Sequence, residues 1–570
     1  MLVNFILYIY ITYFCFTYGL IFWKLSGLIN KAFIKNSTPD FFTLIFTGFS
    51  FLMLILGYYS IFYPIAAEIH FGLLAIALAF SIKHFQLYST FIIGISPPKI
   101  PKIIAVVLVA YFILFLFYSS SNILWYSYDT GLYHAKFVKW ISEYKAVKGL
   151  GNLDGRLAFN SHFYLLTALF SFSFLSNNIF YALNGFFTLI FLLFILHSIL
   201  KNRHRNTNSQ IGIYVLLLIF YFLAFKTFIY SQYADISATI IILFIFFKLF
   251  EDSFNKEEFK QNYNINSIAL LSFSAPILKL SSAFILLLPL FITIMFLIRK
   301  QYFDVVKIII LGTVVILPWL IRNVILSGYL IYPFPALDFF NFDWKIPILN
   351  AIHEKNITEN FARFVGIHNL NAYSINKWLP VWWHKTEALS KLFLALFLSS
   401  ILIVTIARIN LKQIPKSIFI LYLLFFCGSL YAYFQAPSIR FVFAPALACT
   451  FIACFILSEY SIYKSLVGYG NQSLLIIALL LCLYQYRDPI YLIRHSEEFK
   501  IHHLLLPEQY PTVKYKTKTI NNLNIILPIE GNQCWNAGFM CIDPRFLDQN
   551  LSLRGKNIED GFRSRDLKVD

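Results

Sequence analysis

Charged residues are scarce in this sequence. Asp, Glu, Lys and Arg together make up 13% of the 570 residues, whereas soluble globular domains carry about 25%. A soluble protein of this size is therefore not expected. Repeated apolar runs of spanning length predict a polytopic, all-α membrane protein instead. Outer-membrane barrels read as short alternating segments, and the sequence lacks that pattern.

Acidic residues are outnumbered by basic ones, 28 to 46, which gives a net charge of +18. Much of this excess lies in short loops between apolar runs, where the positive-inside rule accounts for it. We therefore expect a lipid bilayer, and no nucleic acid, as partner. Residues 1–23 have neither a basic n-region nor a small-residue cleavage site, so they predict a retained first helix rather than a signal peptide.

Cysteine is also sparse. Five of the seven cysteines lie in apolar runs, where thiols behave as small hydrophobic groups: Cys15, Cys427, Cys449, Cys454 and Cys482. The other two, Cys534 and Cys541, lie in the polar tail and are candidates for a disulfide if the tail faces an oxidising compartment. No spacing typical of metal ligands occurs.

Several common catalytic motifs are missing. The sequence has no GxxxxGK[ST] phosphate loop, no HExxH and no plausible GxSxG elbow. Use of a cytoplasmic nucleotide is therefore not expected. The substrate is predicted to be lipid-borne or extracytoplasmic.

The apolar runs predict about fourteen membrane spans. They are placed at 2–23, 41–57, 62–82, 103–118, 178–200, 211–228, 236–250, 265–278, 281–298, 306–323, 389–408, 417–434, 440–458 and 472–486. Residues 1–486 would form the membrane domain and residues 487–570 a soluble C-terminal domain. A β-hairpin is predicted in this domain between residues 513 and 530.

Five basic clusters orient these spans. They are Lys24, Lys31 and Lys35; Lys83, Lys99 and Lys102; Lys201, Arg203 and Arg205; Arg299 and Lys300; Arg408, Lys412 and Lys416. All fall on one side, interpreted as cytoplasmic. The loops 119–177 and 325–388, the C-terminal domain and both termini are then outside. The apolar block 162–175 must not cross, and it is interpreted as an interfacial or re-entrant helix.

The first outer loop contains a polar segment at 128–161. Its aromatic and apolar residues recur at helical spacing and predict an amphipathic helix in the membrane interface: Tyr133, Phe137, Trp140, Ile141 and Tyr144 on one face, Lys136, Lys139 and Glu143 on the other. Asp129 precedes this helix. It is either a helix N-cap or a carboxylate that accepts a proton from an acceptor hydroxyl, and the sequence leaves both open.

Charged and histidine side chains inside or beside spans are costly and often mark function. The topology puts seven on the outer side: Glu68, His70, Lys226, Asp235, Lys279, Arg322 and Arg440. Snorkelling at the interface is the alternative for each. Arg322 and Arg440 are the candidates for binding a phosphate, because the guanidinium fork makes bidentate bonds, and Lys279 would assist as a point charge. His134 and His162 are further candidates for lining such a cavity, with structural roles as the alternative.

Several segments resemble known membrane proteins. LPWLIRNVILSGYLIYP is similar to the PWxxRNxxxxGxxxYP stretch of many bacterial GT-C class integral-membrane glycosyltransferases. The segments YDTGLYHAKFVKWISEYKAVKGLGNLDGRLAFNS, APSIRF, GNQCWNAGFMCIDP and LRGKNIEDGF resemble more closely a family of uncharacterised bacterial multi-spanning membrane proteins. The resemblance covers most of the chain. One departure is FNSHFYLL after the first loop, where other bacterial GT-C members have a PPL-type stretch.

The GT-C resemblance implies a reaction. The donor would be a polyprenyl-phosphate-linked sugar, and the acceptor a cell-surface glycan or glycolipid at the outer face of the bacterial inner membrane. Asp129 would be the general base, Arg440 or Arg322 would hold the leaving phosphate, and the anomeric carbon would invert. No cofactor is assigned, and a divalent metal stays open. The alternatives are a surface-polysaccharide polymerase or ligase, a lipid-linked sugar transporter or flippase, and a membrane scaffold with a periplasmic tail.

Overall fold

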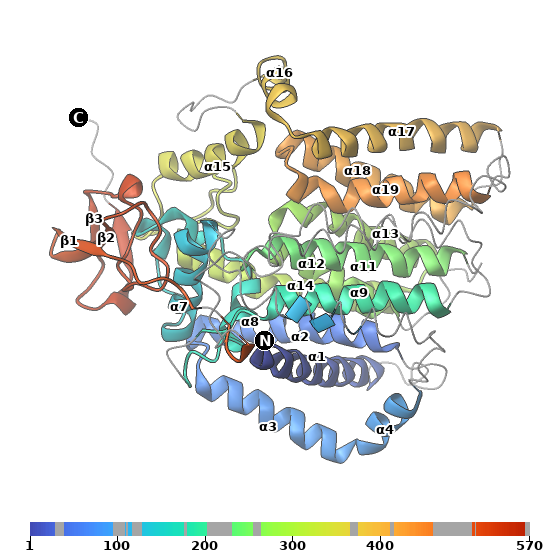
Figure 1. The fold of residues 1–570 in the computed structure, drawn as a ribbon, viewed down its shortest axis with the longest axis horizontal. Coiled ribbons are helices and arrows are strands. Elements are labelled where there is room, and N and C mark those ends of the chain that lie inside the picture. The colour runs from blue at the N-terminus through green and yellow to red at the C-terminus, as the bar shows by residue number, and fades with distance from the viewer. Residues whose placement is uncertain are drawn as a thin grey trace.

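The protein is a bundle of long helices with a strand-containing region at one end (Figure 1). This computed structural model describes residues 1–28, 39–94, 109, 112–113, 115–116, 128–175, 179–201, 231–254, 264–364, 374–410, 415–459, 504–507 and 509–564. The long helices are α1 (Leu2–Leu28), α2 (Phe41–Phe62), α3 (Ala67–Lys83), α9 (Leu183–Lys201), α11 (Ala234–Phe254), α12 (Asn264–Leu278), α13 (Leu287–Ile298), α14 (Tyr302–Ser327), α17 (Ala388–Asn410), α18 (Lys416–Gln435) and α19 (Ile439–Glu459).

Within the described residues, seven helical stretches are long and apolar enough to cross a membrane. They are Leu2–Gly27, Phe41–Phe62, Leu280–Ile298, Tyr302–Ser327, Ala388–Ile409, Lys416–Gln435 and Ile439–Leu457. Each coincides with a predicted span. An eighth crossing would be formed if α3 and α4 (Phe85–Gly94), which meet at a bend of 80°, count as one span.

The other predicted spans have different outcomes. Those at 62–82, 178–200, 236–250 and 265–278 are helical as α3, α9, α11 and α12 but do not alone reach the length and apolarity of a span. One of the seven candidate spans, Leu280–Ile298, begins as a 3-10 helix, η5 (Leu280–Leu286), before α13. The spans at 211–228 and 472–486, and most of that at 103–118, lie outside the described residues.

The α1–α2 contact depends on two glycines. A Cβ on Gly48 would lie 1.7 Å from the Cys15 carbonyl oxygen, and a Cβ on Gly19 would lie 2.1 Å from that of Leu44. The two backbones therefore approach more closely than any side chain would allow. Membrane helices associate through such small residues because apolar burial gives little driving force in lipid.

Contacts at helix ends show which ends lie together. Lys24, near the end of α1, binds His84 at the end of α3. Ser60, at the end of α2, binds Arg322 near the end of α14. The ends of α2 and α14 therefore lie together. Because α1 and α2 run antiparallel, the start of α14 lies at the same end of the bundle as Lys24 (Figure 1).

The same holds for the C-terminal helices. Trp382, just before α17, donates to the Pro437 carbonyl just before α19, so these two helices run in parallel. Arg408, near the end of α17, lies over Phe419 near the start of α18. Six residues of the basic clusters that the sequence predicts as cytoplasmic thus lie at one end of the bundle, here called the basic end: Lys24, Lys83, Arg299, Lys300, Arg408 and Lys416. The opposite end carries the strand region, as Figure 1 shows.

The apolar block 162–175 does not cross the bundle. Its helix, α8 (Phe163–Leu169), has seven residues and is about 10 Å long, whereas a membrane core is about 30 Å thick. All seven residues are buried. The prediction that this block does not span is confirmed.

The predicted amphipathic helix is present, but most of its residues are buried. It consists of a π-helical turn, η2 (Thr130–His134), and α7 (Ala135–Glu143). Lys136 was expected on a polar outer face, and that prediction is wrong. Its side chain is 2% exposed, forms an ion pair with Asp154 at 2.6 Å and donates to the Cys541 carbonyl. The C-terminal region, residues 509–564, covers this side of the helix, where Lys139 Nζ donates to the Ala537 carbonyl at 3.2 Å.

The predicted hairpin is present as β1 (Tyr515–Ile520) and β2 (Leu523–Pro528), paired antiparallel with Ile520 opposite Leu523. Asn521 and Asn522 both have positive φ, as a two-residue type I′ turn requires. A second hairpin, β3 (Leu551–Leu553) with β4 (Phe562–Ser564), was not predicted. The 325–388 loop carries α15 (Ile348–Arg363) and α16 (Ile375–Lys385).

Replacing Gly48 with alanine should destabilise the bundle. The added methyl group collides with backbone on α1, and overpacking of this kind costs roughly 1–3 kcal/mol. Gly72 on α3 is the matched control, because a Cβ there has no atom within 4 Å. We expect Gly48→Ala to lower the melting temperature of the purified protein in detergent and Gly72→Ala to leave it unchanged or raise it. Equal melting temperatures would contradict the close approach.

Candidate functional site

Asp129 and Arg440 meet at the end of the bundle opposite the basic end. Asp129 comes from the first loop and Arg440 from the first turn of α19. Their side chains, 28% and 19% exposed, form an ion pair with 3.9 Å between Asp129 Oδ2 and Arg440 Nη1. This distance exceeds that of a hydrogen bond. The pair is therefore electrostatic and leaves hydrogen-bonding positions on both groups.

Asp129 does not act as a helix cap. It stands at the N-cap position of η2, but its carboxylate accepts no capping hydrogen bond. Its backbone N–H donates instead to the Tyr233 hydroxyl at 3.4 Å. Single π-helical turns occur often at functional sites. Of the two interpretations that the sequence left open, the cap is not supported.

A second ion pair lies beside the first. Asp235 opens α11 and Lys279 follows α12, and their Oδ2 and Nζ atoms are 3.3 Å apart. The Asp235 side chain is 3% exposed, and its Oδ1 atom is buried without a hydrogen-bond partner. An unsatisfied buried carboxylate oxygen is costly. The Asp235 Oδ1 atom could accept a hydrogen bond from a hydroxyl group of a bound ligand.

Arg440 connects the two pairs, because its charge interacts with both Asp235 and Asp129. Its guanidinium lies 5.5 Å from the centre of the Tyr233 ring, and Lys279 Nζ lies 5.3 Å from that of Phe441. Cation–π contacts of this length are favourable. Two carboxylates and two cations thus form one four-charge cluster: Asp129, Asp235, Lys279 and Arg440.

His134 lies beside the four-charge cluster. It is 1% exposed, and its ring contacts those of Tyr133, Tyr164 and Tyr233. Burial lowers its pKa well below the usual histidine value, and the positive charges of Lys279 and Arg440 lower it further. The imidazole is therefore neutral at physiological pH.

Arg322 and His162 form a separate, buried cluster. Arg322 Nε donates to Asn160 Oδ1 at 3.0 Å, and Nη1 donates to the Ser60 hydroxyl at 2.8 Å. These bonds connect the first loop to α2 and α14. The sequence predicted Arg322 as a phosphate ligand, but its side chain is hydrogen-bonded to other residues of the protein. Both ring nitrogens of the neighbouring His162 are buried without a partner. Burial first, and then Arg322, lowers the pKa of His162 far below the usual value.

The remaining candidates are not brought into the four-charge cluster. Glu68 is exposed in the first turn of α3. His70 binds the Tyr10 hydroxyl at 2.8 Å and the Leu169 carbonyl at 3.0 Å. Lys226 lies outside the described residues.

The C-terminal region holds the backbone on both sides of Asp129. Gln533 Nε2 donates to the Tyr128 carbonyl at 2.9 Å, and the Trp535 N–H donates to the Gly131 carbonyl at 2.8 Å. Asn532 Nδ2 donates to the Tyr128 hydroxyl. We call Asn532, Gln533 and Trp535 the C-terminal clamp. Sequence reasoning missed it, and the segment GNQCWNAGFMCIDP was its only signal.

A disulfide closes the loop that carries the clamp. It joins Cys534 to Cys541, the pair that the sequence proposed. Cys534 lies between two clamp residues. The cross-link therefore restrains the segment that positions the Asp129 backbone.

The cluster offers little to a metal ion. No group of three or more His, Cys, Asp and Glu side chains close enough to share one occurs in the part of the chain that the structure describes. Asp129 and Asp235 are each paired with a cation of the protein. We therefore assign no catalytic role to a metal ion.

Glu354 joins α15 to the first loop. Its side chain is buried beside Tyr332 and Gly155. Burial raises its pKa to about 7, with Asp154 adding to the rise and Arg156 opposing it. The packing of α15 against 155–158 thus includes one carboxyl that is poorly ionised at neutral pH.

A family described as a domain of unknown function (DUF8201) has a model that matches residues 1–447 of the chain. The match includes the loop with Asp129 and the start of α19 with Arg440, and it ends before the C-terminal clamp. No curated protein matches the chain, and no solved structure matches it. The function must therefore be argued from the four-charge cluster itself.

Removing the disulfide should loosen the backbone around Asp129. In the double variant Cys534→Ser/Cys541→Ser, we expect amide exchange in peptides covering residues 128–134 to rise roughly tenfold or more, since such cross-links contribute about 2 kcal/mol. Mass spectrometry after deuterium labelling measures this. Cys427→Ser, which changes an exposed free thiol, is the control. Unchanged exchange at 128–134 in the double variant would show that the clamp does not depend on the disulfide.

Glu354→Gln should alter the pH dependence of stability. The exposed glutamate value is 4.5 and the folded pKa is about 7, so between these pH values the folded protein keeps a proton that the unfolded chain releases. Stability falls as pH rises across this window, by up to roughly 3 kcal/mol. The variant should melt higher than the parent at pH 8 and alike at pH 4.5. Glu530→Gln, at an exposed site, should show no such difference; if it does, Glu354 is not the cause.

Proposed function

We propose that this chain, which belongs to the DUF8201 family, is an integral-membrane glycosyltransferase of the GT-C type. It would transfer a sugar from a polyprenyl-phosphate donor to a cell-surface glycan or glycolipid. The observation that carries the proposal is the ion pair between Asp129 and Arg440. A loop carboxylate and a span arginine, far apart in sequence, meet at one end of an apolar bundle.

Asp129 is the general base of the proposed reaction. Its side chain is partly exposed and stands at 3.9 Å from one cation, so an oxygen can still accept a proton. As the acceptor hydroxyl attacks the anomeric carbon, its proton passes to Asp129. The new bond joins the acceptor oxygen to the anomeric carbon, and the bond from that carbon to the phosphate oxygen breaks. Attack opposite the leaving group inverts the anomeric centre.

Arg440 stabilises the leaving phosphate. The polyprenyl phosphate gains negative charge as the bond breaks, and a guanidinium can meet that charge with two parallel hydrogen bonds. Lys279, 32% exposed, adds a second positive charge. Arg322 takes no part, because its side chain is 2% exposed and its Nε and Nη1 atoms donate to Asn160 and Ser60. In this scheme Asp235 keeps Lys279 and Arg440 in place.

The proposed topology has about fourteen spans, both termini outside and the cluster at the outer face of the bacterial inner membrane. Two observations support the orientation. The six residues that define the basic end lie at the end of the bundle opposite the four-charge cluster, as the positive-inside rule expects for a cytoplasmic side. The C-terminal region contains a disulfide, a bond that persists in oxidising compartments.

Asp129→Asn is the direct test. The amide keeps the shape but cannot take the proton, so transfer should fall about 10²–10⁴-fold. The readout is surface glycan on gels from a deletion strain that expresses each variant, with protein level measured by immunoblot. Arg440→Lys, which keeps the charge and loses the fork, should also impair transfer.

Glu68→Gln is the matched control, because this exposed carboxyl lies outside the four-charge cluster. It should restore the glycan fully. Full restoration by Asp129→Asn at normal protein level would overturn the catalytic assignment and favour a non-catalytic role such as lipid-linked sugar transport.

A further inference from the structure

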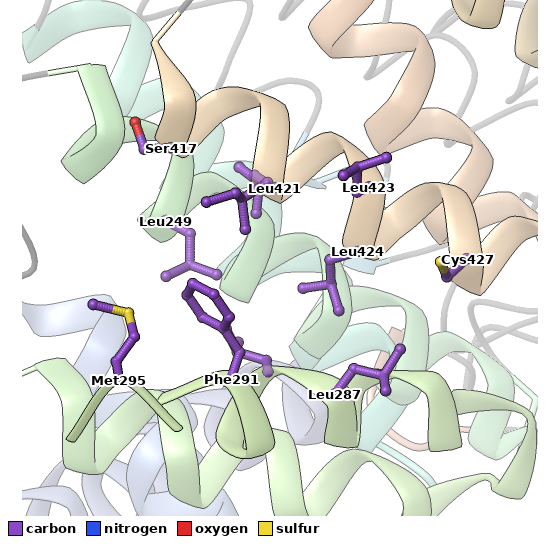
Figure 2. A pocket seen from close by; sticks show the side chains of 11 residues that line it. Leu249, Leu287, Phe291, Met295, Ser417, Leu421, Leu423, Leu424 and Cys427 are labelled. Carbon is purple, nitrogen blue, oxygen red and sulfur yellow. The ribbon is translucent and has the colours of Figure 1, made fainter. Parts of the chain in front are cut away.

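An apolar groove runs between α13 and α18, far from the four-charge cluster. Its volume is about 380 Å³, within the range of natural ligand sites. Leu287, Phe291 and Met295 line it from α13, Leu421 and Leu424 from α18, and Leu249 from α11 behind them (Figure 2). The side chains are almost all hydrocarbon, so the groove suits a flexible apolar chain.

A close contact between η5 and α18 closes one end of the groove. Near Cys427, the Phe284 ring of η5 presses on Gly428 of α18, where an added Cβ would lie 2.4 Å from the ring. Figure 2 places Leu287 and Cys427 at this end and Met295 and Ser417 at the other. Met295 and Ser417 belong to the last turn of α13 and the first turn of α18, so this end of the groove lies toward the basic end.

Cations flank the Met295–Ser417 end of the groove. Lys416 precedes Ser417 and is exposed. Arg299 and Lys300 follow Met295 by about one helical turn, and both are exposed. Basic pockets between membrane helices at the cytoplasmic side bind anionic lipid head groups. Both helices that form the walls belong to candidate spans, so hydrocarbon chains are the molecules present at this depth.

From this arrangement we propose that the groove is a binding site for an anionic phospholipid. One acyl chain lies in the groove, and the head-group phosphate is held by Lys416, Arg299 and Lys300. The site is at the end of the bundle opposite Asp129 and holds whether or not the chain is a glycosyltransferase. The bound chain fills the wedge between α13 and α18, so it should stabilise their arrangement.

The test is native mass spectrometry of the purified full chain with phosphatidylglycerol or phosphatidylcholine of the same acyl chains. We expect several-fold more phosphatidylglycerol adducts. The double variant Arg299→Gln/Lys416→Gln should bring them down to the phosphatidylcholine level, and Leu424→Trp, which fills the groove, should reduce adducts of both lipids. Lys83→Gln and Leu402→Trp are the matched controls, since Lys83 lies on α3 and Leu402 is an exposed residue of α17.

Two outcomes would overturn the proposal. One is equal binding of the two lipids to the parent protein, and the other is an equal loss of adducts in Leu402→Trp and Leu424→Trp. A second measurement needs no substitution. Cys427 is an exposed free thiol in the groove, and its labelling by N-ethylmaleimide should be slower in phosphatidylglycerol nanodiscs than in phosphatidylcholine nanodiscs. Identical rates would count against a seated acyl chain.

Discussion

Charge pairing at the end of an apolar bundle is the constraint on which the site depends. An isolated ion in such surroundings is strongly disfavoured, so a buried charge near a span needs an opposite charge or hydrogen-bond partners within reach. Asp129, Asp235, Lys279 and Arg440 meet this need together, because Arg440 interacts with both carboxylates. Two ion pairs thereby fix the relative positions of the first loop and of α11, α12 and α19.

The C-terminal region also packs on the first loop and holds it in position. Lys136 and Asp154 form a buried ion pair inside the loop, and Lys136 also binds the Cys541 carbonyl. The clamp then holds Tyr128 and Gly131 on either side of Asp129. A carboxylate on a long loop would otherwise sample many positions. Catalysis requires near-fixed geometry, and the clamp supplies it at the residue to which we assign the base.

Part of this could be predicted from the sequence. Hydrophobicity located seven spans, and the two asparagines at 521–522 marked the hairpin turn, because both signals are local. Residue chemistry singled out Asp129, Arg440, Asp235 and Lys279. Residue chemistry could not decide between Arg440 and Arg322 as the phosphate ligand, because both arginines lie near span ends. Only the fold shows that Arg322 is hydrogen-bonded to Asn160 and Ser60.

The clamp and the burial of Lys136 were missed for a related reason. Both depend on contacts between the first loop and residues some 400 positions later, which no local pattern reports. Lys136 lies on the polar face of α7 in sequence, and the C-terminal region covers that face through contacts with Lys136 and Lys139.

The proposed site requires that Asp129 and Arg440 lie side by side. Chemical cross-linking in native membranes tests it most directly, using Asp129→Cys/Arg440→Cys in a background where the exposed Cys427 is serine, with a short bifunctional thiol reagent. We expect an intramolecular cross-link in Asp129→Cys/Arg440→Cys and none in Glu68→Cys/Arg440→Cys. Failure of the first pair to cross-link in folded protein, or equal cross-linking of both, would contradict it.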